Sequence, residues 1–189
     1  MPKVHTVQKA QKEHKCGRCS IAILPGQPYR WALKAYSTKM FRCMEHPLRP
    51  SELTSSDKLA TIYGALEGVE DDIDGLEDGS ISLGDLVESL EQAAEEIRNT
   101  GEEYEESASN MEQYFSGSSQ IDEIHEKAEA CEELASELES AARTIGDLDE
   151  ALQEALEGDM TETEKATKIT SLIEEARSSA EDAVGSSSL

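Results

Sequence analysis

The sequence predicts a mostly α-helical protein in which a small β-hairpin module precedes an acidic, antiparallel helical bundle or coiled coil. Three observations support this fold class. Two closely spaced pairs of Cys and His residues lie within the first 50 residues, apolar residues recur at heptad spacing after residue 54, and the sign of the charge reverses between these regions. We expect a module over residues 1–52, a four-helix bundle over 53–184 and a flexible tail over 185–189.

The charge is divided very unevenly along the chain. The 189 residues contain 17 Lys and Arg against 41 Asp and Glu, a formal net charge of −24. Residues 1–50 hold ten Lys and Arg and two acids, a net charge of +8, which leaves seven Lys and Arg and 39 acids, or −32, for residues 51–189. Hydrophobic residues make up 37% and aromatic residues 4%, which disfavours a compact enzyme, and no apolar run could span a bilayer. We expect no enzymatic activity and no membrane contact.

The basic segment has the ligand spacing of a zinc site. Cys16 and Cys19 form a C-x₂-C pair, and Cys43 and His46 form a C-x₂-H pair further along the chain. Two such pairs can surround one tetrahedral Zn²⁺, and metal binding can supply the folding free energy that so small a core lacks. His5 and His14 are alternative fourth ligands, and free thiols or disulfides are the alternative without metal.

A hairpin is predicted between the two ligand pairs. Residues 29–34 alternate between an apolar set and a set that includes Arg30 and Lys34, which is typical of a strand with one apolar and one basic face. Pro25-Gly26 marks a turn before it, and residues 39–42 suit a second strand. We interpret Tyr29 and Trp31 as the core of this hairpin, with base stacking as the alternative role.

The first 55 residues resemble the zinc finger of the poly(ADP-ribose) polymerase type. The resemblance is carried by Cys16-Gly17-Arg18-Cys19, Ile23, Pro25-Gly26, Tyr29-Arg30-Trp31 and the later pair of Cys43 and His46. The resemblance implies a finger that binds DNA ends and breaks, although the second pair in that family runs His then Cys.

The opening Met-Pro-x-Val-His and the segment Arg-Pro-Ser-Glu-Leu-Thr also resemble small proteins of tailed bacteriophages. This implies a cytoplasmic protein, in the host cytoplasm if the chain is viral.

Heptad spacing predicts four helices of about 23, 33, 38 and 24 residues in the acidic segment. The first should begin at Thr54 or Ser55 and end at Gly75 or Gly79. The second should end before Ser116, and a break at Gly158-Asp159 should separate the third from the fourth. Thr161 and Glu164 should form a capping box. The predicted core rows are Leu59, Leu66 and Ile73; Ile62, Val69 and Leu76; Leu83, Leu90, Ile97, Tyr104 and Met111; Ile124, Cys131, Leu138, Ile145 and Leu152; Ile121, Ala128, Ala135, Ala142 and Leu156; and Ala166, Ile169, Ile173, Ala176 and Ala180.

Short connections favour antiparallel neighbours. The second and third helices should form a long hairpin with its tip at Ser116–Ser119, and the two short helices should pack at the opposite end. A monomer is favoured over a parallel homodimer, because Gly and Ser interrupt the heptads. Residues 74–85 partly match a calcium-binding loop, but Leu76 lacks a ligand oxygen, and we interpret the segment as an interhelical turn.

Two classes of function remain. The zinc module could bind DNA or RNA through Arg18, Arg30, Lys34, Lys39 and Arg42, with the residues before Cys16 as a flexible basic arm. Alternatively, the acidic bundle could bind a basic host protein, as a DNA mimic, inhibitor or recruiter. A third interpretation is a structural component of phage assembly.

Overall fold

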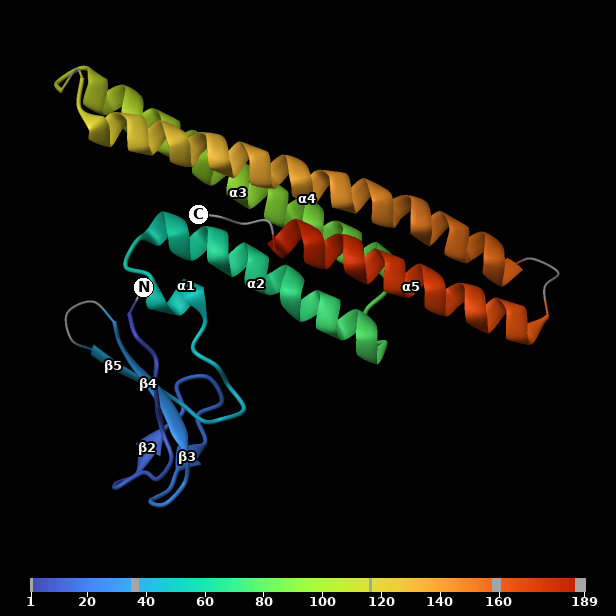
Figure 1. The fold of residues 1–189 in the computed structure, drawn as a ribbon, viewed down its shortest axis with the longest axis horizontal. Coiled ribbons are helices and arrows are strands. Elements are labelled where there is room, and N and C mark those ends of the chain that lie inside the picture. The colour runs from blue at the N-terminus through green and yellow to red at the C-terminus, as the bar shows by residue number, and fades with distance from the viewer. Residues whose placement is uncertain (1, 35–37, 116, 158–160, 186–189) are drawn as a thin grey trace. The chain divides into compact units, whose positions relative to one another are not determined.

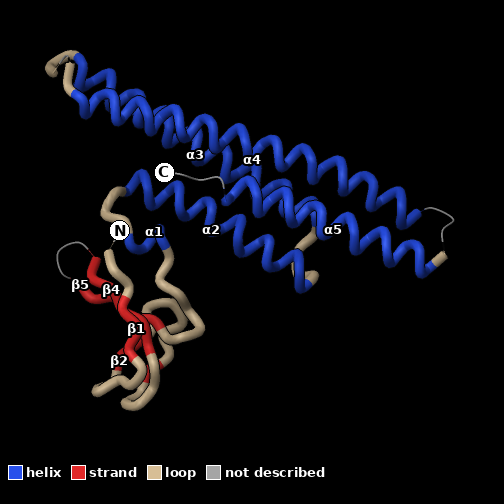
Figure 2. The backbone as a smooth tube through the Cα atoms, viewed as in Figure 1, coloured by secondary structure: helices blue, strands red, loops and turns tan. Residues whose placement is uncertain are grey.

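The computed structural model describes residues 2–34, 38–115, 117–157 and 161–185 (Figure 1). The chain divides into two compact units, residues 1–64 and residues 65–189. The first contains a small antiparallel sheet, and the second contains a helical bundle (Figure 2). This is the mostly α-helical fold that the sequence predicts. The separate prediction of a domain boundary near residue 52 stays a prediction.

The first unit holds two small sheets. Strands β1 (His5–Val7), β4 (Tyr29–Lys34) and β5 (Thr38–Arg42) form an antiparallel sheet in the order β1-β4-β5. Strands β2 (His14–Lys15) and β3 (Ala22–Ile23) form a separate two-stranded sheet. The predicted hairpin of two strands is confirmed as β4 and β5, in which Trp31 is opposite Phe41.

Strand β1 differs from the expectation of a flexible basic arm before Cys16. His5 pairs with Trp31 and Val7 with Tyr29, so this segment is the third strand of the sheet. Further along, the backbone of Ala10 exchanges hydrogen bonds with Gly26 and Gln27 at 2.8 and 2.9 Å. The expectation of a flexible arm was therefore wrong. Without β1, strand β4 would be an edge strand with unpaired backbone N–H and C=O groups, and residues 5–7 pair with these groups.

One face of the sheet is covered by the segment that follows it. Ala32 of β4 is fully buried in a cluster with Leu48 and Leu53, against which Met40 packs. Leu53 ends the single-turn helix α1 (Pro50–Leu53), which contacts β4. The residues after the second ligand pair therefore complete the core of the sheet.

Helix α2 (Asp57–Asp78) begins after Ser56, one or two residues later than predicted. Its buried apolar positions in the described part, Ile62, Leu66, Val69, Ile73 and Leu76, are five of the six predicted heptad positions. Gly79 follows in the left-handed region with φ of 76°, and Ser82 then caps the next helix by accepting a hydrogen bond from Asp85 N. The interhelical turn expected over residues 74–85 is present but shorter, because residues 74–78 belong to α2 and α3 begins at Leu83, which leaves residues 79–82 as the turn.

Helices α3 (Leu83–Glu112) and α4 (Ser119–Glu157) form the long hairpin of the second unit (Figure 2). The predicted core residues Leu90, Ile97, Leu138 and Ile145 are all fully buried. Gly101 lies against Cys131, which confirms that Cys131 is buried in the helix interface. The predicted tip begins at Ser116, which is outside the described residues, and continues through Gly117 at a φ of 84°.

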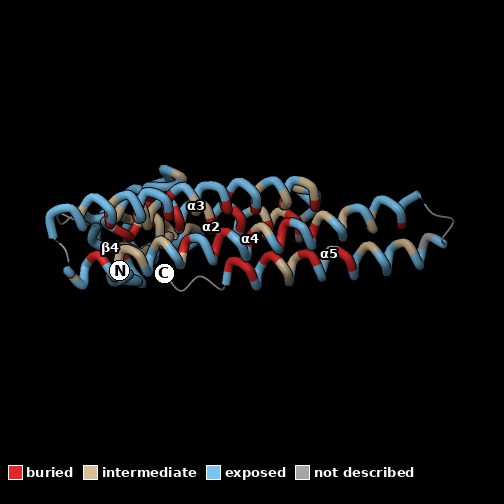
Figure 3. The backbone as a smooth tube through the Cα atoms, turned by 90° about the horizontal axis from the view of Figure 1, so that it is seen from above, coloured by how far each residue is buried: buried red, intermediate tan, exposed pale blue. Residues whose placement is uncertain are grey.

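Helix α5 (Glu162–Gly185) packs on α4, and Figure 3 shows buried positions recurring along both helices. The capping box of Thr161 and Glu164 is confirmed by hydrogen bonds of 3.0 and 3.4 Å. Two predicted core positions were wrong: Leu156 is 48% exposed, and Ala166 is exposed. Leu172, Ala183 and Val184 are buried instead, because a straight helix drifts away from a strict seven-residue repeat.

The predicted break at Gly158-Asp159 lies outside the described residues, as do residues 186–189 of the predicted tail. Among the helices that the structure describes, none has the length and apolar character needed to cross a membrane.

Candidate functional site

Four side chains of the first unit form a cluster that could hold a metal ion. One ligand atom from each of Cys16, Cys19, Cys43 and His46 lies within 4.8 Å of all the others. The Cys19 and Cys43 sulfurs are 4.0 Å apart, and His46 Nδ1 lies 3.9 Å from Cys16 Sγ and 3.1 Å from Cys43 Sγ. None of the four cysteines, all of which the structure describes, forms a disulfide bond, which removes the disulfide alternative in this structure.

The first ligand pair lies in the tight turn between β2 and β3. Cys16 N donates to Ile21 O, and Ser20 N donates to Cys16 O, both at 3.0 Å. Ser20 adopts a positive φ of 62°, which brings the chain back toward β3. A Cβ atom on Gly17 would collide with the Arg42 guanidinium, so the first of the two residues between the cysteines has to be small. The backbone thus aims both sulfurs at the second pair.

The second ligand pair follows β5 directly. Cys43 and His46 are joined by a turn in which His46 N donates to Cys43 O at 3.3 Å. Gly17 N donates to Phe41 O at 3.0 Å and fixes the first turn beside the end of β5. The other candidate histidines lie elsewhere, since His14 stacks on Phe41 and His5 stacks on Trp31. The structure therefore selects His46 as the fourth member of the cluster.

The surroundings of the cluster affect the ionisation of its thiols. Burial opposes ionisation of Cys16, but backbone hydrogen bonds, that of Cys19 first, outweigh it and lower the pKa of Cys16 to about 6. Burial raises the pKa of Cys43, and its contact with the Cys16 sulfur adds to this effect. The lowered pKa favours the thiolate of Cys16 at neutral pH, and thiolates are the form in which cysteine binds metals.

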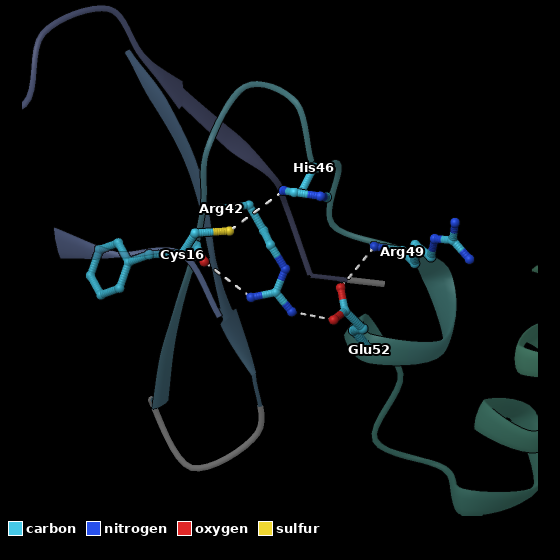
Figure 4. A network of polar contacts seen from close by, with 6 residues as sticks. Cys16, Arg42, His46, Arg49 and Glu52 are labelled. Carbon is cyan, nitrogen blue, oxygen red and sulfur yellow. Dashed lines mark hydrogen bonds and ion pairs between the residues drawn. The ribbon is translucent and has the colours of Figure 1, made fainter. Parts of the chain in front are cut away.

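Arg42 connects this cluster to α1 (Figure 4). Its side chain is buried, donates to Phe41 O at 3.0 Å and forms an ion pair with Glu52. Glu52 also accepts a hydrogen bond from Arg49 N at 3.1 Å. The sequence predicts Arg42 as a nucleic-acid contact, but a buried, paired guanidinium cannot reach a phosphate. We therefore leave it out of any proposed binding surface.

The remaining predicted contacts are divided between the two faces of the sheet. Arg30 is half-buried, lies on the same face as Arg42 and donates to Met44 O at 3.2 Å. Lys34 is exposed near the edge of that face, and Arg18 is exposed in the first ligand turn. Lys39 is exposed on the opposite face, where its Nζ lies 5.0 Å from the centre of the Trp31 ring. The structure does not bring the five predicted residues together as one patch.

The aromatic side chains form a different surface. The sequence interpretation placed Tyr29 and Trp31 in the core of the hairpin, and Tyr29 does pack against the buried cluster of Ala10, Cys16 and Ile23. Tyr29, Trp31 and Phe41 are only half-buried, and Leu33 of the same face is 42% exposed. The three aromatic side chains lie along an open groove of about 640 Å³. We call this surface the basic–aromatic groove and define it by Lys9, Lys12, His14, Tyr29, Trp31, Lys39 and Phe41.

Sequence alternation alone identifies the two faces of β4 but not which of them is covered. The covered face is the one with Ala32 and Arg42, because Leu48, Leu53 and Glu52 pack there. Lys9 and Lys12 were expected in a flexible basic arm, and their place beside β4 was not predicted because no periodic pattern connects them to that strand.

Comparison of the chain with protein-family models, with curated proteins and with solved structures finds no match. The resemblance to the poly(ADP-ribose) polymerase finger therefore stays a prediction.

Proposed function

We propose that the chain is a non-enzymatic zinc-finger protein whose first unit binds nucleic acid. The observation that carries this proposal is the Cys₃His cluster, which lies within a unit of eleven Lys and Arg against four Asp and Glu. The unit has a charge of +7 before the metal and its thiolates are counted, which attracts polyanions. A bound metal would also occupy the three clustered cysteines, which could otherwise act as nucleophiles.

Zinc is the metal that suits this donor set best. Three sulfurs and one imidazole nitrogen form a common structural zinc site, with zinc–sulfur bonds of about 2.3 Å. Two sulfurs bound tetrahedrally at that length lie about 3.8 Å apart, close to the 4.0 Å between Cys19 and Cys43. Cys16, Cys19, Cys43 and His46 would hold the ion, which stabilises the turns after β2 and β5.

Exposed lysines of the first unit support the proposal that this unit attracts the phosphates of nucleic acid. Lys9, Lys12, Lys15 and Lys39 are all exposed, and in the described part of the chain Lys9 and Lys12 make no ion pair. Lysines that keep their ammonium groups in water can exchange that hydration for phosphate oxygens and release counterions from the nucleic acid.

The test uses the full chain with one equivalent of zinc and fluorescently labelled nucleic acid. We expect binding that weakens steeply as salt is raised, and loss of binding when Cys19 and Cys43 are both replaced by Ser. Lys127→Ala serves as the charge control, because Lys127 is exposed on α4 and should leave binding unchanged. No binding of any nucleic acid at low salt would contradict the proposal.

A second candidate function concerns the helical unit as an arm that binds a basic protein. Residues 65–189 hold six Lys and Arg against 37 Asp and Glu, a net charge of −31. Tyr114 and Phe115 are 79% and 65% exposed at the end of α3, and exposed aromatic side chains are typical anchors in interfaces. Carboxylates around such anchors would favour a cationic surface.

This second proposal predicts that Tyr114→Ala with Phe115→Ala weakens capture of a basic partner by the full chain. Leu156→Ala is the matched control. Leu156 is also exposed but lies at the C-terminal end of α4, whereas Tyr114 and Phe115 precede the N-terminal end of that helix. Equal capture by both variants and the parent chain would contradict an anchoring role for the two aromatics.

A further inference from the structure

The sheet of the first unit has one covered face and one accessible face, and the accessible face contains the aromatic rings. Ala32 is fully buried on the covered face, whereas Trp31 and Phe41 on the other face are only half-buried. A sheet whose aromatic side chains face solvent is unusual for a small domain, because these rings would contribute most to its core if they were covered. The arrangement calls for a ligand with flat apolar surfaces.

The rings of this face are held in fixed orientations by stacking. His5 stacks on Trp31 with ring centres 4.5 Å apart and an angle of 13° between the planes. His14 stacks on Phe41 at 4.2 Å and 23°, and it also lies 4.9 Å from Tyr29. Each pair joins a ring of the sheet to a histidine from an earlier segment, so a histidine covers one face of Trp31 and one face of Phe41, and of these two histidines His14 also lines the groove.

Three ammonium groups accompany these rings. Lys9, Lys12 and Lys39 border the groove, and Lys39 Nζ lies over Trp31 at 5.0 Å from its centre. None of the residues that line the groove in the described structure is Asp or Glu. The groove therefore offers aromatic stacking surfaces and positive charge together.

We propose that the basic–aromatic groove binds single-stranded nucleic acid, with unpaired bases stacking on its aromatic rings and Lys9, Lys12 and Lys39 contacting phosphates. This inference rests on the proposed nucleic-acid function and adds the form of the ligand. Bases in a duplex have their flat faces occupied by their neighbours, so only an unpaired strand offers both π faces and phosphates to such a groove. An entering base takes the place of the Lys39 ammonium over Trp31, and the flexible Lys39 side chain turns to a phosphate.

Trp31 is the only tryptophan of the chain, so its fluorescence reports directly on the groove. The experiment titrates the full zinc-loaded chain with oligothymidylate and oligouridylate of about 12 nucleotides, within the usual site size of such surfaces. A blunt duplex of the same length and a polyglutamate of equal charge are titrated in parallel. We expect Trp31 quenching by both single strands, and an affinity at least about ten-fold higher than for the duplex.

Lys39→Ala and Lys34→Ala form a matched pair, because both lysines are exposed and they lie on opposite faces of the same hairpin. Three phosphate contacts should make log K fall with log salt at a slope of about −2, and Lys39→Ala should reduce that slope by about 0.7. Lys34→Ala should reduce it less. Trp31→Leu should weaken single-strand binding by about five-fold or more, while its zinc content shows that the module remains folded.

The outcomes separate this inference from the proposed function. Preference for single strands, quenching of Trp31 and a larger effect of Lys39→Ala than of Lys34→Ala support the groove. Equal binding of duplex and single strand, unquenched Trp31 or polyglutamate binding as tight as oligothymidylate overturns the groove but leaves nucleic-acid binding in place. Absence of binding to every nucleic acid overturns both.

Discussion

Arg42, the last residue of β5, and Glu52 of α1 form an ion pair that fastens the sheet to the segment covering it. The guanidinium also contacts Phe41 O, and it lies so close to Gly17 that no side chain fits there. One buried cation thus connects the first ligand turn, the end of β5 and α1. This network stabilises the site and leaves phosphate contacts to other cations.

Glu52→Gln should destabilise the first unit by about 2–3 kcal/mol, because it leaves the Arg42 charge buried without its counter-charge. The value lies below that of a fully buried pair, since the Glu52 side chain is 30% exposed. Glu181→Gln is the control, because its exposed i,i+4 pair with Arg177 should contribute about 0.5 kcal/mol or less. Urea unfolding followed by Trp31 fluorescence measures the first variant, and circular dichroism measures the second. Similar losses for both would contradict the role of burial.

Cys43→Ser should remove the metal and unfold the module, because metal binding supplies much of the folding free energy of so small a core. Cys131→Ser should keep one zinc per chain, since Cys131 is buried between α3 and α4 and takes no part in the cluster. Elemental analysis of the purified proteins gives the ratio of zinc to protein. A zinc-free parent chain with native Trp31 fluorescence would refute the metal site.

Gly101→Ala should destabilise the helical unit by about 1–2 kcal/mol, although Ala favours helices. The new Cβ would lie 3.0 Å from Cys131 Cβ and 3.4 Å from Ala128 O. Relief of this overlap would require the backbone of α3 or α4 to shift, with a loss of packing between the two helices. Gly146→Ala on α4 meets no atom within 4 Å and should stabilise by about 0.5–1 kcal/mol. Chemical unfolding of both variants should give changes of opposite sign, and changes of the same sign would show that the helices readjust.

The tip half of the α3–α4 hairpin should depend on pH through His125. A hydrogen bond from His125 Nδ1 to Glu105 at 2.8 Å raises the pKa of His125, and Glu112 adds to the shift. Because the pKa is higher in the folded state, the stabilisation is complete below about pH 6.5, the value of unfolded histidine. It is lost as pH rises through the folded value.

NMR titration of the His125 ring should therefore give a pKa above that of an unfolded peptide, and Glu105→Gln should lower it. Glu106→Gln is the matched control, since Glu106 is the exposed neighbour of Glu105 in the chain and makes no contact with His125 among the described residues. Equal pKa values in both variants would mean that the total acidity of the bundle, rather than Glu105, raises the pKa.

The sequence predicts what depends on local spacing. Cys16, Cys19, Cys43 and His46 are identified by their two short intervals, and turns of a few residues then bring each pair together. Buried residues such as Leu90 and Ile97 follow from the heptad, which also places the helix ends to within a few residues.

Long-range packing was not predictable in the same way. The pairing of His5 with Trp31 and the covering of Ala32 by Leu48 and Leu53 join residues about 15 to 25 positions apart, with no repeat to indicate them. These contacts decide which face of β4 is open. Because the aromatic face looked like core in the sequence, its accessible position is the main correction to the predicted site.

The positions of the four cluster residues also bear on the order in which the chain folds during synthesis. All of them lie between residues 16 and 46, and the cover of the sheet is complete at Leu53. A ribosome that is still translating α4 has already released every one of these side chains, whereas the α3–α4 hairpin requires residues up to Glu157. Metal capture can therefore come first, and the positively charged first unit could fold before the acidic α3–α4 hairpin is complete.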